Sequence, residues 1–193
     1  MTDDKNTKTT AEEVNEILEE ARNNFKAKKY LNTLALCYKA GSLDPGNLDV
    51  DWLLAMTHFE KGTLETEWDT DDTITACKCF ENLAERDPAR RALAYLYNGI
   101  AIVRWGNNYR IAIERFDKVL ELEPKNELAV KFRDICRKCM DGNTPEAQGD
   151  LNSLLESIQA DYRINLSLNQ ILPSLKYLDE EGVRSFQLYP KKR

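Results

Sequence analysis

Two segments of the chain repeat the same spacing of an alanine, a phenylalanine and a proline. In each, the phenylalanine follows the alanine by four residues and the proline comes eight residues later, as in Ala76, Phe80, Pro88 and in Ala112, Phe116, Pro124. A spacing of four places two side chains on one face of an α-helix. Proline ends a helix because it lacks the backbone N–H. The sequence therefore predicts a chain of similar helical units.

The clearest unit runs from residue 95 to residue 124. It reads as two amphipathic helices joined at Gly106, Asn107 and Asn108. Gly99 predicts a close approach between the two helices, since glycine adds no side chain at the contact. Trp52, seven residues after Pro45, opens the preceding unit.

These residues make the chain resemble the tetratricopeptide repeat (TPR) family, whose units of about 34 residues are helix–turn–helix pairs. The resemblance implies an all-α fold, a right-handed superhelical stack of antiparallel helix pairs with three to four repeats and a C-terminal capping segment. We expect a domain over residues 11–160, with repeats at about 14–47, 49–90, 92–125 and 127–160. Residues 1–10 are predicted to be disordered, and 161–193 to be partly helical with a basic tail.

Two local patterns refine the first unit. Thr10 and Glu13 predict a capping box at the start of its first helix. In its second helix, Leu31, Leu34, Ala35 and Tyr38 are the expected apolar residues.

The second unit departs from the family at an acidic insertion, residues 62–72, which exceeds a tight turn by about eight residues. Trp68, Asp69 and Asp71 in this insertion predict a second contact surface, because an aromatic residue in an acidic loop is typical of interfaces. The alternative is a solvated loop.

In the TPR family the first helix of each pair lines a concave groove that receives a peptide or helix of a partner. The positions that match this groove are mostly basic here, although the chain has a net charge of -6. A basic groove favours an acidic partner; ordinary solvated side chains are the alternative. The predicted groove residues are Arg22, Lys26, Thr57, Lys61, Tyr97, Ile100, Arg104, Lys131 and Lys138.

The best-known TPR subfamily clamps the C-terminal carboxylate of Hsp70 or Hsp90 with lysine, asparagine and arginine. The matching positions of this chain carry Leu18, Leu54, Leu96 and Ile100, with Arg22, so the clamp is absent. The resemblance predicts a non-catalytic adaptor, with a co-chaperone-like or regulatory assembly subunit completed by a partner chain as the alternative. The aliphatic residues on this face suggest that residues 161–188 fold back into the groove or cap the stack, with a partner segment as the rival.

The sequence gives less support for enzyme activity or for metal binding. His58 is the only histidine and has no local nucleophile motif, so no enzyme activity is predicted. The pairs Cys77, Cys79 and Cys136, Cys139 fall within predicted helices and favour buried thiols over a metal site. We therefore expect no metal and no cofactor.

The composition indicates which compartment and which class of partner are favoured. The odd number of cysteines, five, favours reduced thiols in the cytoplasm, with the nucleus as an alternative. No apolar run has the length of a membrane span. The negative net charge disfavours nucleic acid. RNA binding through arginines 86, 90, 91, 104, 110 and 115, near Tyr95, Tyr97 and Trp105, is a more remote alternative.

Overall fold

The computed structural model describes residues 9–64, 70–106, 108–142 and 144–160. These residues form eight α-helices and no strand, which confirms the all-α prediction for the described part of the chain. The helices are α1 (Thr10–Lys26), α2 (Tyr30–Leu43), α3 (Leu48–Leu64), α4 (Thr70–Arg86), α5 (Arg91–Gly106), α6 (Tyr109–Leu122), α7 (Glu127–Gly142) and α8 (Pro145–Ala160).

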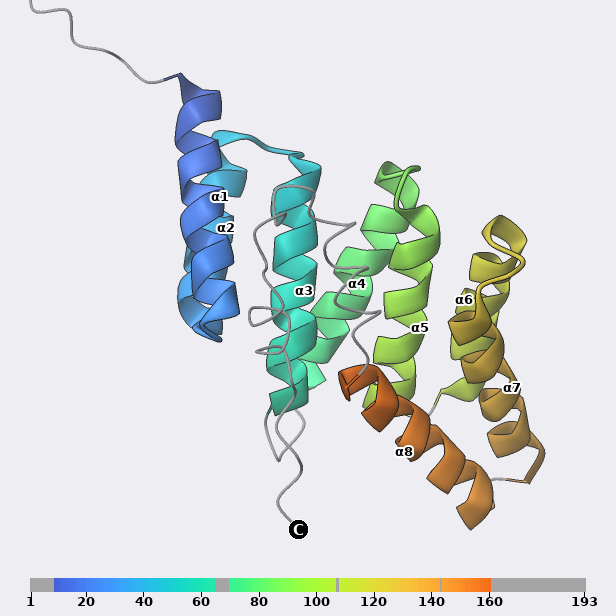
Figure 1. Ribbon diagram of the computed structural model, residues 1–193. Helices are drawn as coiled ribbons and strands as arrows, with labels where there is room; N and C mark the ends of the chain where they lie inside the picture. The colour runs from blue at the N-terminus through green and yellow to red at the C-terminus, as the bar shows by residue number, and fades with distance from the viewer. Residues whose placement is uncertain (1–8, 65–69, 107, 143, 161–193) are drawn as a thin grey trace, which may run out of the picture.

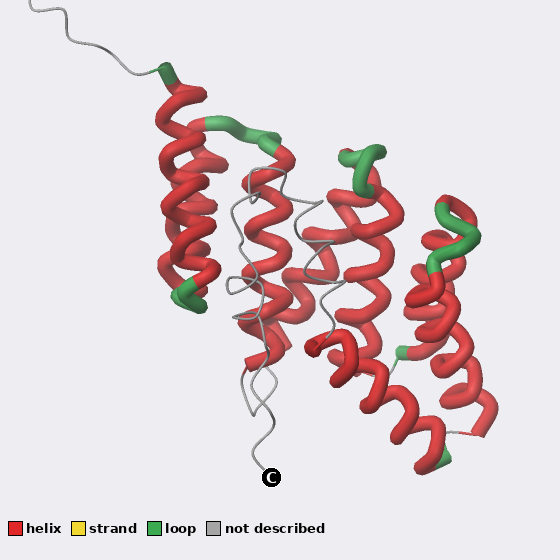
Figure 2. The backbone as a smooth tube through the Cα atoms, in the orientation of Figure 1, coloured by secondary structure: helices red, strands yellow, loops and turns green. Residues whose placement is uncertain are grey.

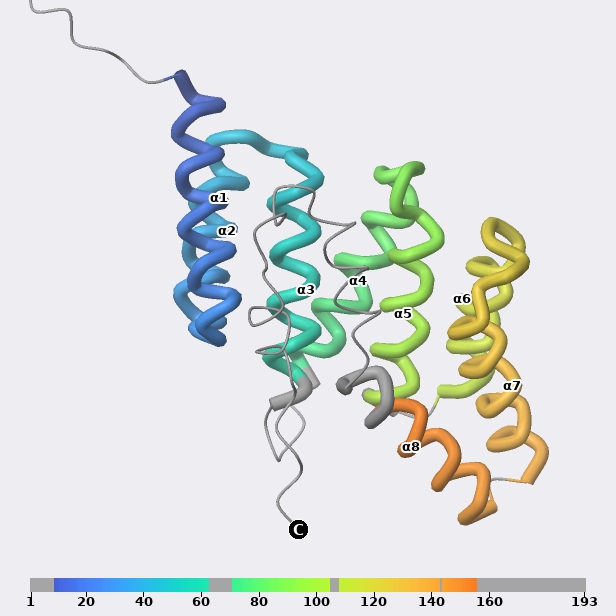
Figure 3. The backbone as a smooth tube through the Cα atoms, in the orientation of Figure 1, coloured from blue at the N-terminus to red at the C-terminus, as the bar shows by residue number. Residues whose placement is uncertain are grey.

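The helices pack in consecutive antiparallel pairs, and each pair also packs on the next (Figure 1). We refer to α1, α3, α5 and α7 as the A helices and to α2, α4, α6 and α8 as the B helices. The A helices run in the same direction, and short loops connect α1 to α2, α2 to α3, α4 to α5 and α6 to α7 (Figures 2 and 3). This arrangement is compatible with a helical repeat. None of the described helices is both long and apolar enough to span a membrane.

The core contains the residues that carry the repeat spacing. Ala76, Phe80, Ala112 and Phe116 are fully buried. The ring of Phe80 stacks on Tyr97 of the next A helix at 5.4 Å between centroids, and Phe116 stacks on Phe132 of α7 at 5.2 Å. Each of these B-helix phenylalanines therefore joins its own pair to the following one.

The close approach predicted at Gly99 is confirmed. A methyl group added at Gly99 would lie 2.6 Å from Cε1 of Phe116, well inside normal contact. Because the Phe116 ring is buried and stacked, it has little room to move.

The predicted apolar face of α2 is wrong. Leu31 and Tyr38 are exposed, and the buried residues of this helix are Tyr30, Thr33, Cys37 and Ala40. Thr33 can be buried because its hydroxyl donates to the carbonyl oxygen of Lys29 at 3.1 Å. A satisfied hydroxyl therefore occupies the buried face in place of the larger apolar side chains.

The capping box of α1 lies one residue earlier than predicted. The N-cap is Thr9, whose hydroxyl accepts from the backbone N–H of Glu12, while the Glu12 carboxylate accepts from the N–H of Thr9. Residues 9–10 are both threonine and residues 12–13 both glutamate, so either register satisfies the same motif.

Much of the acidic insertion is helical. Helix α3 continues to Leu64 and α4 begins at Thr70, so both helices extend into the segment predicted as a loop. Trp68 and Asp69 lie outside the described residues, as do residues 161–193, on which the groove-filling hypothesis depends. Asp71 is exposed in the first turn of α4.

Candidate functional site

The nine predicted groove residues do not form one open basic face. Five of them are buried, namely Arg22, Thr57, Tyr97, Ile100 and Arg104. Lys26 and Lys61 are partly buried, whereas Lys131 and Lys138 are exposed.

Three of the predicted cations share a position that the sequence analysis did not use. Lys26, Lys61 and Arg104 each lie in the last turn of an A helix. The carbonyl groups at a helix C-terminus carry partial negative charge and favour a cation there. These three cations therefore have in common a position at the end of an A helix, and not a place along the length of a groove.

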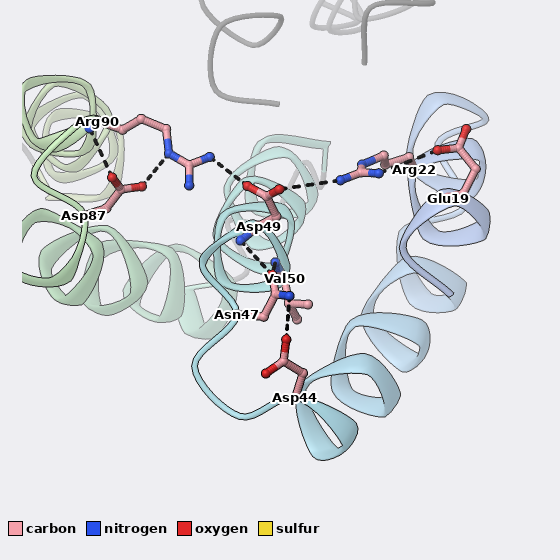
Figure 4. Close-up of polar contacts among 8 residues, drawn as sticks. All are labelled: Glu19, Arg22, Asp44, Asn47, Asp49, Val50, Asp87 and Arg90. Carbon is pink, nitrogen blue, oxygen red and sulfur yellow. Dashed lines mark hydrogen bonds and ion pairs between the residues drawn. The ribbon is translucent and has the colours of Figure 1, made fainter. Parts of the chain in front are cut away.

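The starts of α3 and α5, together with the second half of α1, carry a network of ion pairs, which we call the Asp49 network (Figure 4). Asp49 lies in the first turn of α3. Its carboxylate accepts a hydrogen bond from Arg90 at 3.0 Å and lies 3.9 Å from Nη2 of the Arg22 guanidinium. Arg22 also pairs with Glu19 at 3.6 Å. One carboxylate thus links α1, α3 and the residue that precedes α5.

Asp87 completes the Asp49 network. Its carboxylate accepts from the indole Nε1 of Trp52 at 2.8 Å, from the guanidinium of Arg90 and from the Arg90 backbone N–H at 3.2 Å. Burial alone would raise the pKa of the Asp87 carboxyl, but these hydrogen bonds and the charge of Arg90 hold that pKa below its ordinary value. Both oxygens of the Asp87 carboxylate are therefore paired.

Near the ends of α3 and α5 lies a second group of buried side chains, which we call the Arg104 cluster: Phe59, Glu60, Tyr97 and Arg104. The guanidinium of Arg104 lies over the Phe59 ring at 4.8 Å, and the Phe59 and Tyr97 rings meet edge to face at 5.5 Å. Phe59 thus contacts a cation and a phenol that lie two turns apart on α5.

The Arg104 cluster is electrostatically different from the Asp49 network. Burial raises the pKa of Glu60 to about 7, against the opposing charges of Arg104 and of Lys28 in the α1–α2 connection. Burial also lowers the pKa of Arg104 and raises that of Tyr97. Within the described residues, the Tyr97 hydroxyl and one terminal nitrogen of Arg104, Nη1, are buried without a hydrogen-bond partner.

Comparison with protein-family models, with curated proteins and with solved structures found no match to this chain. The TPR resemblance therefore remains a prediction from the residues that carry it. Any function has to be argued from the geometry of the site.

His58 belongs to a third polar group, at the α3–α4 contact. Its Nδ1 lies 2.5 Å from the carboxylate of Asp72, which also binds the amino group of Lys61, and its Nε2 lies 3.4 Å from the Tyr38 hydroxyl. These contacts join α2, α3 and α4. They also pair Lys61, which was predicted as a free cation of the groove.

The cysteines are free thiols in the structure. Cys136 and Cys139 are buried, as predicted, and Cys77 and Cys79 are partly buried. Burial raises the pKa of the Cys136 thiol to about 12 and that of Cys77 to about 11, so both are protonated at neutral pH. Among the residues that the structure describes, no group of three or more histidine, cysteine or acidic side chains is placed to hold a metal ion.

Sequence reasoning missed Glu60 and Asp49, the acidic centres of the two groups. A signal for Glu60 was present, because Leu53, Thr57 and Glu60 follow the four- and three-residue spacing of one helix face, and the first two are fully buried. A charged residue in a buried stripe has to be stabilised by its surroundings and so marks a special site.

Proposed function

We propose that this chain is a non-catalytic scaffold of TPR-like helix pairs that binds a segment of a partner protein along its A helices. One observation carries the proposal. The buried side-chain atoms that lack a hydrogen-bond partner in the described residues are Nε of Arg22, the hydroxyl of Tyr97 and Nη1 of Arg104, and all three belong to predicted groove residues.

Such atoms point to a ligand because leaving a buried donor unpaired destabilises a protein by about 1 to 3 kcal/mol. Folded proteins therefore leave few of them, and each needs an explanation. An acceptor supplied by a partner is one explanation, and the restriction of these atoms to A helices supports it.

The same structure favours a protein partner over RNA. Of the arginines considered for RNA binding, Arg86 pairs with Asp51 at 2.6 Å, Arg90 with Asp49 at 3.0 Å and Arg115 with Glu81 at 2.6 Å. Because carboxylates of the chain already engage these guanidinium groups, they are poor ligands for phosphate.

The test is charge reversal at A helices compared with B helices. The first variant carries Lys26→Glu and Lys131→Glu, on α1 and α7. The control carries Lys39→Glu and Lys78→Glu, at exposed positions of α2 and α4. Both change the net charge by the same amount, so nonspecific electrostatic effects are matched.

Partners captured by the full wild-type chain are quantified by mass spectrometry for both variants. We expect the A-helix variant to lose at least about 90% of a specific partner, whereas the B-helix variant retains it. Equal retention by both variants, with unchanged circular dichroism, contradicts binding along the A helices.

A further inference from the structure

Tyr97 and Arg104 each carry a buried, unpaired donor, and both side chains contact Phe59. Tyr97 is 2% exposed and Arg104 is 9% exposed, so neither side chain is solvated along most of its length. They are seven residues apart on α5, which places them on one face of the helix. The unpaired atoms are a phenolic O–H and a guanidinium N–H, and no acceptor for either lies in the described part of the chain.

Neighbouring groups hold these donors in place and are themselves satisfied. The Tyr97 ring lies between Phe80, on which it stacks, and the edge of Phe59. Thr57, three residues before Glu60 on α3, is also buried, and its hydroxyl donates to the carbonyl oxygen of Leu53 at 2.6 Å. The positions of the donors are thus fixed before any ligand arrives, which reduces the entropy lost on binding.

The missing partner has to be an acceptor with negative charge. A buried guanidinium is stabilised by a carboxylate, whose two oxygens can accept from Arg104 and from the Tyr97 hydroxyl at the same time. Glu60 balances the charge of Arg104 only when it is ionised, so when Glu60 is protonated a neutral carbonyl would satisfy one donor and leave the cation uncompensated.

We propose that the Tyr97 hydroxyl and the Arg104 guanidinium, positioned by Phe59, form a binding site for a carboxylate group of a partner peptide. The proposal rests on the scaffold function above and specifies its ligand chemistry. The carboxylate comes either from an acidic side chain or from a chain terminus, and the same pair of donors would bind both.

Three fluorescein-labelled peptides separate these sources: six glutamates with an amidated C-terminus, six glutamines with an amidated C-terminus, and six glutamines with a free C-terminus. Fluorescence anisotropy with the full chain at pH 6.5 gives Kd for each. We expect the glutamate peptide, the free-terminus peptide or both to bind at least about tenfold more tightly than the amidated glutamine peptide. Equal affinity for all three peptides, or no binding of either carboxylate peptide, overturns the proposal.

Matched variants locate the site. Tyr97→Phe removes only the hydroxyl and keeps the stacked ring, and we expect it to weaken carboxylate binding about tenfold; Arg104→Gln removes the charge and is expected to weaken it more. Tyr95→Phe makes the same chemical change on the same helix, where the ring contacts Lys118 instead, and is expected to leave Kd unchanged. Thermal unfolding of Tyr97→Phe checks that the fold is retained.

The outcome also separates this site from the general scaffold function. If Tyr97→Phe and Arg104→Gln bind the carboxylate peptides as the wild type does, the site is wrong. If, in addition, the Lys26→Glu, Lys131→Glu variant still loses the captured partner, binding along the A helices stands without the carboxylate site.

Discussion

The two ends of α3 and α5 differ in whether their charged and polar side chains have partners. At their starts, the Asp49 network gives each carboxylate a basic partner, and Asp87 also receives the indole N–H of Trp52. Near their ends, the Arg104 cluster buries a cation, a phenol and an acid but leaves two donors unpaired.

The difference separates structural charge from charge that is available for binding. Apart from Nε of Arg22, the members of the Asp49 network are paired, so this network holds neighbouring helices together and has little unused capacity for a ligand. A cluster with unpaired donors is less favourable for folding and keeps that capacity. The same helices therefore carry a structural end and a candidate binding end, and mutations at the two ends should have different consequences.

The largest effect is expected at the fully paired end. Asp87→Ala leaves the Trp52 indole N–H and the Arg90 guanidinium without their shared acceptor, and we expect a loss of about 4 kcal/mol in the free energy of unfolding. Urea denaturation followed by circular dichroism measures it. Glu85→Ala, at an exposed position two residues earlier, is the control and should change stability by less than about 0.5 kcal/mol. A loss below about 1 kcal/mol for Asp87→Ala would show that the network is not structural.

A second effect, expected only at the Arg104 cluster, depends on pH. Glu60 has a pKa of about 7 in the folded chain, above its ordinary value of 4.5, so the folded state holds this proton more tightly than the unfolded state. The resulting stabilisation is complete below about pH 4.5 and is lost as the pH rises through 7. Its full size is about 3 kcal/mol. Glu60→Gln removes it, because glutamine does not titrate.

The measurement is the difference in unfolding free energy between the wild type and Glu60→Gln from pH 5 to pH 8, since titrations common to both proteins cancel. We expect the wild type to lose stability relative to the variant by about 2 to 3 kcal/mol over this range. A flat difference would mean that Glu60 titrates normally and that the two ends of α3 do not differ as described.

The sequence predicted the helix pairs well because their spacing directly reflects packing. Ala76 and Phe80 had to lie on one buried face whatever their partners were. The face of α2 could not be predicted from hydrophobicity, because the large apolar side chain of Leu31 is exposed whereas Thr33, with its polar hydroxyl, is buried.

The candidate site was predicted only in part, for a different reason. Arg22 and Arg104 were identified from their positions, but their burial was not, because a basic residue on a helix surface normally stays solvated. Burial of Arg104 depends on a contact with Phe59, 45 residues earlier in the sequence, and on the charge of Glu60. Such long-range contacts are properties of the packed helices and leave no local pattern.

The smallest effect is expected from a substitution that tests both ends with the same chemistry. Arg104→Met at pH 6 removes a buried cation whose terminal nitrogen has no acceptor, at a pH where Glu60 is mostly protonated, so we expect a change within about 1 kcal/mol or a slight gain in stability. Arg90→Met removes an arginine that pairs with both Asp49 and Asp87, and we expect it to lose about 2 kcal/mol, less than Asp87→Ala because Arg90 is partly exposed. Parallel urea denaturation of the two variants gives the comparison. Equal losses would show that Arg104 is as well paired as Arg90 and would remove the physical basis for a ligand site at the end of α5.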